Sequence, residues 1–170
     1  MNRAVANTWL FLEEADYDTR MAMLADAVRH GRMRLHQFCL MGNHEHLLLS
    51  VEDDELAKLM QRLNRSYAGN FNRVHRRRGR LFDGPYESVP VVSERHLIEL
   101  IRYIALNPEQ ISSFGRAETY RYSSYSSLIG LTQPLSFVDP EPLYGAVGGA
   151  DPRRRIIEIV ADGRLRKRAA

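Results

Sequence analysis

Residues 33–51 have the sequence MRLHQFCLMGNHEHLLLSV, in which two largely apolar runs flank the dipeptide Gly42-Asn43. Short runs of this kind around a two-residue turn signal are typical of an antiparallel hairpin, although Gly-Asn is the less favoured order for the turn. We therefore expect strands over residues 33–41 and 44–51.

Helices with apolar stripes are expected on either side of this hairpin. Before it, residues 16–30 place apolar side chains at spacings of four, three and four residues, with an aspartate near the start as a possible N-cap. After it, residues 56–74 carry a longer apolar stripe. Asp53 or Asp54 can cap this second helix.

A third helix is expected in the second half of the chain. Ser93 is a good N-cap, and Pro108 stops the helix at about Asn107. Residues 86–92 look like another strand, and residues 120–130 look like a short helix packed on the core. Strands and helices interspersed around one antiparallel hairpin favour an α+β sandwich with a central antiparallel sheet over a doubly wound parallel sheet.

The length and composition are those of one globular domain. The chain has 170 residues, of which 44% are hydrophobic and 26% charged, so collagen, coiled coil and bulk disorder are excluded. Residues 131–151 are rich in proline and are interpreted as a tether, followed by a short helix over residues 153–161. We expect a main domain over residues 1–130 and a tether with a basic C-terminal helix or tail over residues 131–170.

Cysteine content and hydropathy predict a soluble cytoplasmic protein. Cys39 is the only cysteine, so the chain has no disulfide framework, which indicates a reducing compartment. No apolar run approaches the roughly 20 residues that a membrane helix needs, and the N-terminus lacks the layout of a secretory signal.

The charged residues are strongly segregated along the chain. The net charge is only +3, but residues 57–80 hold eight basic and no acidic side chains, and residues 152–170 hold seven basic and two acidic ones. Basic charge concentrated in this way favours a polyanion-binding surface such as one for nucleic acid, although a solvated helix face or a basic tail has the same composition. The candidate phosphate-binding residues of the first block are Lys58, Arg62, Arg65, Arg73, Arg76, Arg77, Arg78 and Arg80.

Two pairs of polar residues have the spacing of a reactive site. His44 and His46 lie two apart on an expected strand, so both imidazoles leave the same face with Cα atoms about 7 Å apart and can converge on one divalent ion. Tyr103 and Asn107 lie four apart on the third helix, one turn from each other. Taken singly, each residue also suits a surface strand, a core tyrosine or a helix terminus.

The ordered combination of these segments resembles a known family. Residues 41–49 (MGNHEHLLL), a basic helix, residues 102–108 (RYIALNP) and residues 122–125 (YSSY) together look like the single-tyrosine HUH transposases, and within them the REP-associated tyrosine transposases. The resemblance runs from about Asn7 to Gly130. It implies a ferredoxin-like HUH sandwich.

The resemblance also implies a reaction and its residues. His44, His46 and Asn107 would hold Mg²⁺ or Mn²⁺, and Tyr103 would be the nucleophile on single-stranded DNA, leaving a 5′-phosphotyrosyl link. Family members recognise hairpins formed by palindromic repeats, and they act as monomers or homodimers. The chemistry is consistent, because a tyrosine hydroxyl with a pKa of about 10 needs help at neutral pH, and imidazole with amide oxygen suits these ions better than structural zinc.

Three features depart from the family pattern. The chain leaves almost no room for the usual first strand, which is expected to be truncated; Glu45 replaces an apolar residue between the histidines; and residues 85 and 87 are Pro and Glu where basic residues are common. A buried charge at Glu45 is costly unless it is paired. Two alternatives therefore stay open: a catalytically silent protein that binds single-stranded DNA or RNA hairpins, and a metal hydrolase for which Tyr103 is dispensable.

Overall fold

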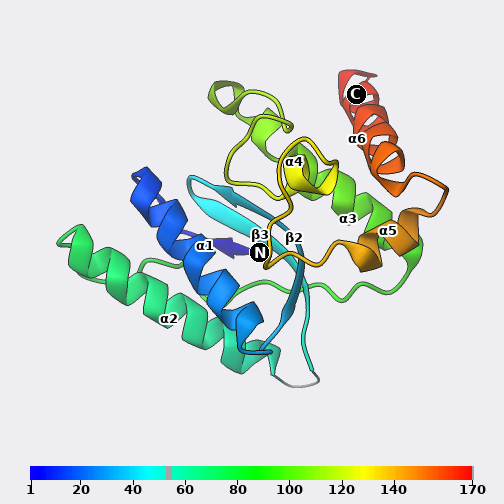
Figure 1. The fold of residues 1–170 in the computed structure, drawn as a ribbon. Coiled ribbons are helices and arrows are strands. Elements are labelled where there is room, and N and C mark those ends of the chain that lie inside the picture. The colour runs from blue at the N-terminus through cyan, green and yellow to red at the C-terminus, as the bar shows by residue number, and fades with distance from the viewer. Residues whose placement is uncertain (53–54, 170) are drawn as a thin grey trace.

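A computed structural model of the protein describes residues 1–52 and 55–169. It is an α+β fold with a three-stranded antiparallel sheet in the order β1-β3-β2, as Figure 1 shows. The strands are β1 (Asn2–Arg3), β2 (Arg34–Met41) and β3 (His44–Ser50). The helices are α1 (Glu14–Arg29), α2 (Leu56–Val74), α3 (Glu94–Leu106), α4 (Tyr125–Leu128), α5 (Glu141–Val147) and α6 (Pro152–Ala169), with 3₁₀ turns at Pro108–Gln110 and Ser112–Phe114.

The central hairpin is confirmed. β2 and β3 pair antiparallel with Cys39 opposite His46 and Met41 opposite His44, and the register is irregular only near the far end, between Leu35 and Gln37. Gly42 has no Cβ, and one built there would lie 2.7 Å from the ring of Trp9, so the turn is closely covered by the loop that precedes α1.

The first strand is short, and another segment extends its pairing. β1 has only two residues and pairs with β3, Asn2 opposite Glu45 and Arg3 opposite His44. On its outer side, residues 81–87 run antiparallel to it, because Val5 N donates to Leu81 O (3.0 Å) and Glu87 N donates to Met1 O (2.9 Å). The backbone groups beside the shortened strand are therefore hydrogen-bonded.

The prediction of a strand over residues 86–92 is wrong. Residues 86–92 form no strand, and the isolated bridge between Phe82 and Ala4 lies just before them. Pro85 and Pro90 have no amide hydrogen to donate to a ladder, and Gly84 has a positive φ of 85°, so the segment stays extended but irregular.

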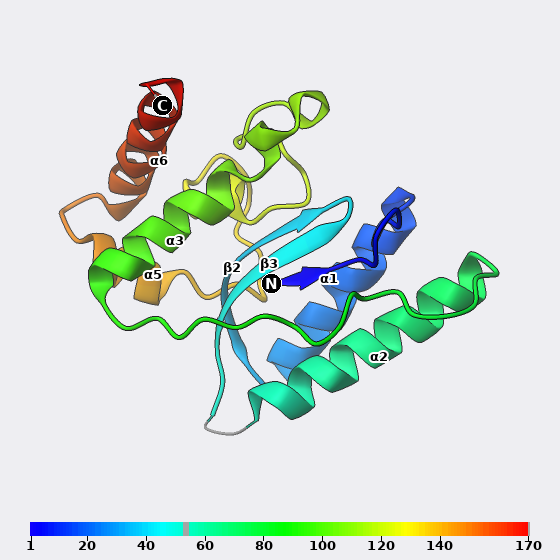
Figure 2. The same cartoon turned by 180° about the vertical axis from the view of Figure 1, so that it is seen from behind.

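Two helical layers cover the faces of the sheet. Alternate residues of β2 point to opposite faces, so Phe38 and Leu40 pack with α1 and α2, while Cys39 and Met41 pack with α3 to α6. Figures 1 and 2 show α1 and α2 together on one side of the sheet and α3, α5 and α6 on the other. α3 therefore packs on the face of the sheet that carries Cys39 and Met41. These two residues lie opposite His46 and His44 of β3.

Helix starts agree with the sequence in one case and differ in another. Ser93 caps α3, accepting a hydrogen bond from His96 N at 3.2 Å, as expected. α1 begins earlier than expected, and Asp16 accepts hydrogen bonds from Leu12 N and Glu13 N at its start. The aspartates expected to cap α2, at positions 53 and 54, lie outside the described residues.

The segment after residue 130 contains more structure than a tether. Residues 141–147 form α5, with Leu143 buried, and α6 buries Ile156 and Val160 in the same cluster as α3. Pro140 and Pro142 obscured this helix in the sequence, although proline is well tolerated at a helix start. None of the helices in the described ranges combines the length and hydropathy needed to cross a membrane.

Candidate active site

Four predicted site residues come together between β3 and the C-terminal end of α3. The rings of His44 and His46 have centroids 5.1 Å apart, and the rings of His46 and Tyr103 are also 5.1 Å apart, each pair edge to face. Nε2 of His44 lies 3.3 Å from Oδ1 of Asn107. Residues 63 positions apart in the chain thus share one site.

The end of α3 fixes the orientation of Asn107. Its backbone N–H contacts the Ile104 carbonyl in a tightened last turn, which leaves the Tyr103 carbonyl for another donor. The Asn107 side chain provides it, with Nδ2 donating to Tyr103 O at 2.9 Å. Asn107 is only 2% exposed, so this bond aims its oxygen at His44.

His44 and Asn107 present lone pairs to each other. Nδ1 of His44 lies 2.8 Å from Oδ1 of Asn43, an acceptor, which assigns the ring proton to Nδ1. Nε2 is then an acceptor as well, and it faces the oxygen of Asn107. Two acceptors at 3.3 Å repel each other unless a cation or a proton lies between them.

The histidines are held neutral, which is the metal-binding form. Burial, the neighbouring His44 and the positive amino terminus lower the pKa of His46 to about 3. Burial also lowers the pKa of His44. Nε2 of His46 is buried and has no hydrogen-bond partner among the described residues. Two imidazole rings and one amide oxygen therefore lie together, and this set of groups fits a divalent cation.

Tyr103 is accessible from a groove. Its side chain is 48% exposed, unlike the other residues of the site. Together with His46 it lines one end of a groove of about 620 Å³ that runs between β3, α3 and residues 86–91. A substrate lying in this groove can reach the phenol.

Glu45 is paired, and its partner was missed by the sequence reasoning. It is fully buried on the opposite face of β3 from the histidines, where it forms an ion pair with the fully buried Arg20 of α1. Arg20 Nε donates to it at 2.9 Å and Asn2 Nδ2 at 2.6 Å, while Arg20 also reaches Asn64. The signal was the position of Arg20 on the inward face of the first helix.

The predicted basic residues divide into groups. Lys58, Arg65 and Arg80 line a second groove, of about 580 Å³, beside α2. Arg77 is only partly exposed and lies 5.8 Å from the centre of the Phe71 ring. The remaining four lie at exposed positions outside that groove: Arg62, Arg73, Arg76 and Arg78.

A second group of possible metal ligands lies on the other side of the sheet. Glu13, Asp16 and His75 have ligand atoms within 4.8 Å of one another, so this group could hold a metal ion. Asp16 already accepts hydrogen bonds from Leu12 N, Glu13 N and His75 Nε2, the last at 2.8 Å. These hydrogen bonds also give the cluster a structural role, because they link α1 to the end of α2.

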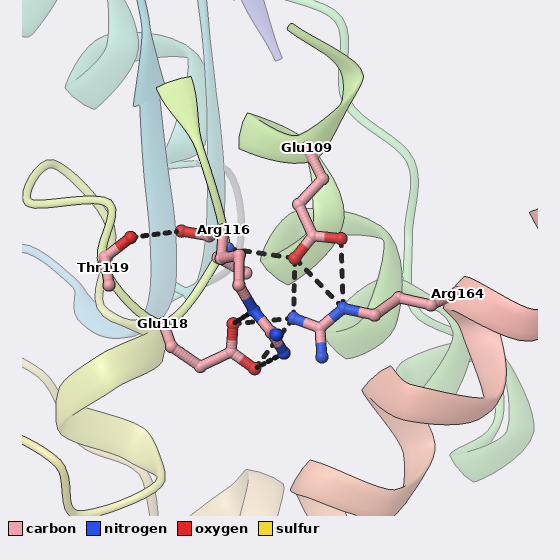
Figure 3. A network of polar contacts seen from close by, with 6 residues as sticks. Glu109, Arg116, Glu118, Thr119 and Arg164 are labelled. Atoms are coloured by element: carbon pink, nitrogen blue, oxygen red, sulfur yellow. Dashed lines mark hydrogen bonds and ion pairs between the residues drawn. The ribbon is translucent and has the colours of Figure 1, made fainter. Parts of the chain in front are cut away.

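The turn after Asn107 is tied to α6, as Figure 3 shows. Arg164 of α6 binds both Glu109 and Glu118, with its closest contacts at 2.6 Å and 2.7 Å. Glu109 also accepts a hydrogen bond from Ala117 N at 3.0 Å. No local sequence pattern indicates that Arg164 would bind Glu109 and Glu118, because these three residues are separated by 9 to 55 positions.

Comparison with known protein families gives one match. The model described as "Transposase IS200 like" matches residues 10–107, a span that contains His44, His46, Tyr103 and Asn107. Comparison with curated proteins and comparison with solved structures each found no match. Because the matched span is more than half of the chain, the protein belongs to the IS200-like transposase family, whose substrate is DNA.

Proposed function

We propose that the protein is a metal-dependent endonuclease and strand transferase of the REP-associated type, acting on single-stranded DNA with hairpin-forming repeats. The observation that carries this proposal is the convergence of unshared lone pairs beside an accessible phenol. His44 and Asn107 face each other as acceptors at 3.3 Å, His46 has an unpartnered Nε2, and the exposed Tyr103 adjoins them.

His44, His46 and Asn107 would hold Mg²⁺ or Mn²⁺ in this proposal. When bound, such an ion neutralises charge on a phosphate oxygen and so favours attack at phosphorus. The residues themselves keep the site ready: Asn43 fixes the tautomer of His44, and the Tyr103 carbonyl fixes the amide of Asn107. The family is generally metal-dependent, which agrees with this assignment.

Tyr103 would act as the nucleophile. A bond forms between its phenolic oxygen and phosphorus as the phenol releases its proton to solvent. The bond from phosphorus to the 3′ oxygen breaks, and this oxygen takes up a proton from solvent to become a free 3′-hydroxyl. The 5′-phosphotyrosyl bond retains the energy of the phosphodiester. Attack on it by a 3′-hydroxyl therefore rejoins strands without ATP.

Two observations favour the enzyme over a catalytically silent binding protein. The charge of Glu45 is compensated by Arg20, and the short first strand is flanked by residues 81–87. Neither the buried charge nor the short strand is therefore a reason to expect an inactive site. In this proposal residues 1–130 are the catalytic part, and residues 131–170 are an accessory segment. The active species is a monomer or a homodimer.

The test is incubation with end-labelled hairpin oligonucleotides in Mn²⁺ or in chelator, followed by a denaturing gel and mass spectrometry. We expect a metal-dependent DNA adduct on the tryptic peptide that begins at Tyr103, and none in the Tyr103→Phe variant. Because the phenol is exposed, Tyr103→Phe should fold as the parent does. The proposal fails if that variant cuts hairpin DNA as well as the parent, an outcome that would favour a hydrolase.

A further inference from the structure

The groove beside α2 is a second candidate contact surface. One of its walls is α2, which contributes Lys58 and Arg65, and the opposite wall is the extended segment 80–86. We propose that this groove binds the single-stranded DNA that flanks the scissile phosphate, an inference that rests on the proposed function. This proposal gives Lys58, Arg65 and Arg80, which line the groove, a role that the other basic residues of positions 57–80 do not share.

The charge of the groove suits a chain of phosphates. Its lining contains three cationic side chains and no carboxylate. Lys58 contacts Glu55 at 2.7 Å, but no carboxylate of the described residues lies within ion-pair distance of Arg65 or Arg80. Lys58 and Arg65 are seven residues apart on the helix, about 10 Å along its axis, so they can contact different phosphates.

The apolar part of the groove suits unpaired bases. Phe82 and Tyr86 are half-buried and line the wall opposite α2, next to Pro85. Sites for single-stranded nucleic acid combine a basic track for the backbone with aromatic side chains for the bases. In a duplex the base faces are stacked on one another and are hidden from such side chains, so the composition favours a single strand.

Tyr86 connects this groove to the active site. It lines the second groove together with Arg65 and Arg80, and it also lines the first groove together with His46 and Tyr103. The backbone pairing of Glu87 with Met1 holds this segment against β1. A strand whose phosphate lies at Tyr103 can therefore continue past Tyr86 into the basic groove.

The inference is tested by binding of two DNA hairpins, one blunt and one carrying a flank of ten thymidines, measured by fluorescence anisotropy in chelator. The groove variant is Lys58→Gln/Arg65→Gln/Arg80→Gln. We expect it to lose about tenfold or more in affinity for the flanked hairpin and little for the blunt one. For the flanked hairpin, a plot of log K against log salt concentration should have a slope that is shallower by about two in this variant. Each contact with a single-strand phosphate contributes about 0.7 to that slope, and three contacts are removed.

The control carries the same change of net charge at exposed helix positions away from both grooves: Arg29→Gln/Arg95→Gln/Arg154→Gln. It should bind the two hairpins with the preference of the parent. For the bases, Tyr86→Phe should retain the preference for the flank, whereas Tyr86→Leu, which keeps an apolar side chain, should weaken it. Thermal unfolding of each variant checks that the fold is intact.

The inference is overturned if the groove variant loses the same affinity for both hairpins, or loses none. Because binding is measured without metal, it does not depend on cleavage. Loss of flank binding in the groove variant would support the groove even if the parent never formed a covalent adduct. Conversely, adduct formation with an unchanged flank preference in the groove variant would reject the groove and leave the proposed reaction standing.

Discussion

Replacing Glu45 with glutamine removes one charge from a buried ion pair while keeping the size of the side chain. Glu45 and Arg20 are both fully buried, and Glu45 accepts hydrogen bonds from Arg20 and from Asn2. After the change, the guanidinium of Arg20 stays buried without its countercharge. Breaking a buried pair in this way typically costs about 3–5 kcal/mol, which in a domain of this size lowers Tm by roughly 6–20 °C.

A double variant separates the charge from the packing. In Arg20→Met/Glu45→Leu neither charge is present, and apolar replacement of both partners is often neutral or stabilising, so we expect it to be more stable than Glu45→Gln. Asn2 and Asn64 still bond each other, with Asn64 Nδ2 donating at 2.8 Å.

The free energies of unfolding of the three proteins are measured by urea denaturation, which is followed through the fluorescence of the single tryptophan, Trp9. If the free energy of unfolding of Glu45→Gln is within about 1 kcal/mol of that of the parent, or if the double variant is the least stable of the three, Arg20 does not compensate the buried charge of Glu45.

Three further predictions concern the turn, the metal and the C-terminal network. Gly42→Ala places a Cβ 2.7 Å from the ring of Trp9, so the ring must move; we expect altered tryptophan emission and a loss of about 1–3 kcal/mol in the free energy of unfolding, and unchanged emission would contradict this. His46→Ala should weaken Mn²⁺ binding about tenfold or more in a calorimetric titration, whereas Glu13→Gln should not; the opposite result would place the ion in the Glu13, Asp16 and His75 group. Burial raises the pKa values of Glu109 and Glu118, but the hydrogen bonds from Arg164 outweigh burial and hold both pKa values below their usual range. The contribution of these carboxylates to stability is therefore present above about pH 4.5 and is lost as the pH falls through the lowered pKa values. Tm should consequently fall more steeply below that pH in the parent than in Arg164→Met, and parallel curves would show that the network adds nothing.

Local signals in the sequence predicted the parts of the fold that depend on neighbouring residues. The hairpin around Gly42-Asn43 and the cap of α3 at Ser93 follow from turn and capping chemistry within a few positions. The membership of His44, His46, Tyr103 and Asn107 in one site was expected from the family resemblance. The structure adds contacts that orient two of them: Asn43 with His44, and the Tyr103 carbonyl with the side chain of Asn107.

Features that depend on distant parts of the chain could not be read in the same way. The pairing of residues 81–87 with β1 replaces a regular strand, and nothing near Pro85 indicates the partner. Arg20 and Glu45 are 25 positions apart, and Arg164 lies 55 positions from Glu109. In each case the folded arrangement, rather than any local pattern, selects the partner.

The covered edges of the sheet bear on how two copies of the chain could assemble. At the outer edge of β2, Leu40 N donates to Tyr122 O, Ser124 N donates to Phe38 O, and Asp139 N donates to Leu35 O. At the opposite edge, residues 81–87 lie beside β1 and are hydrogen-bonded to it. A second copy therefore cannot pair directly with β2 or β1 without first displacing one of these segments.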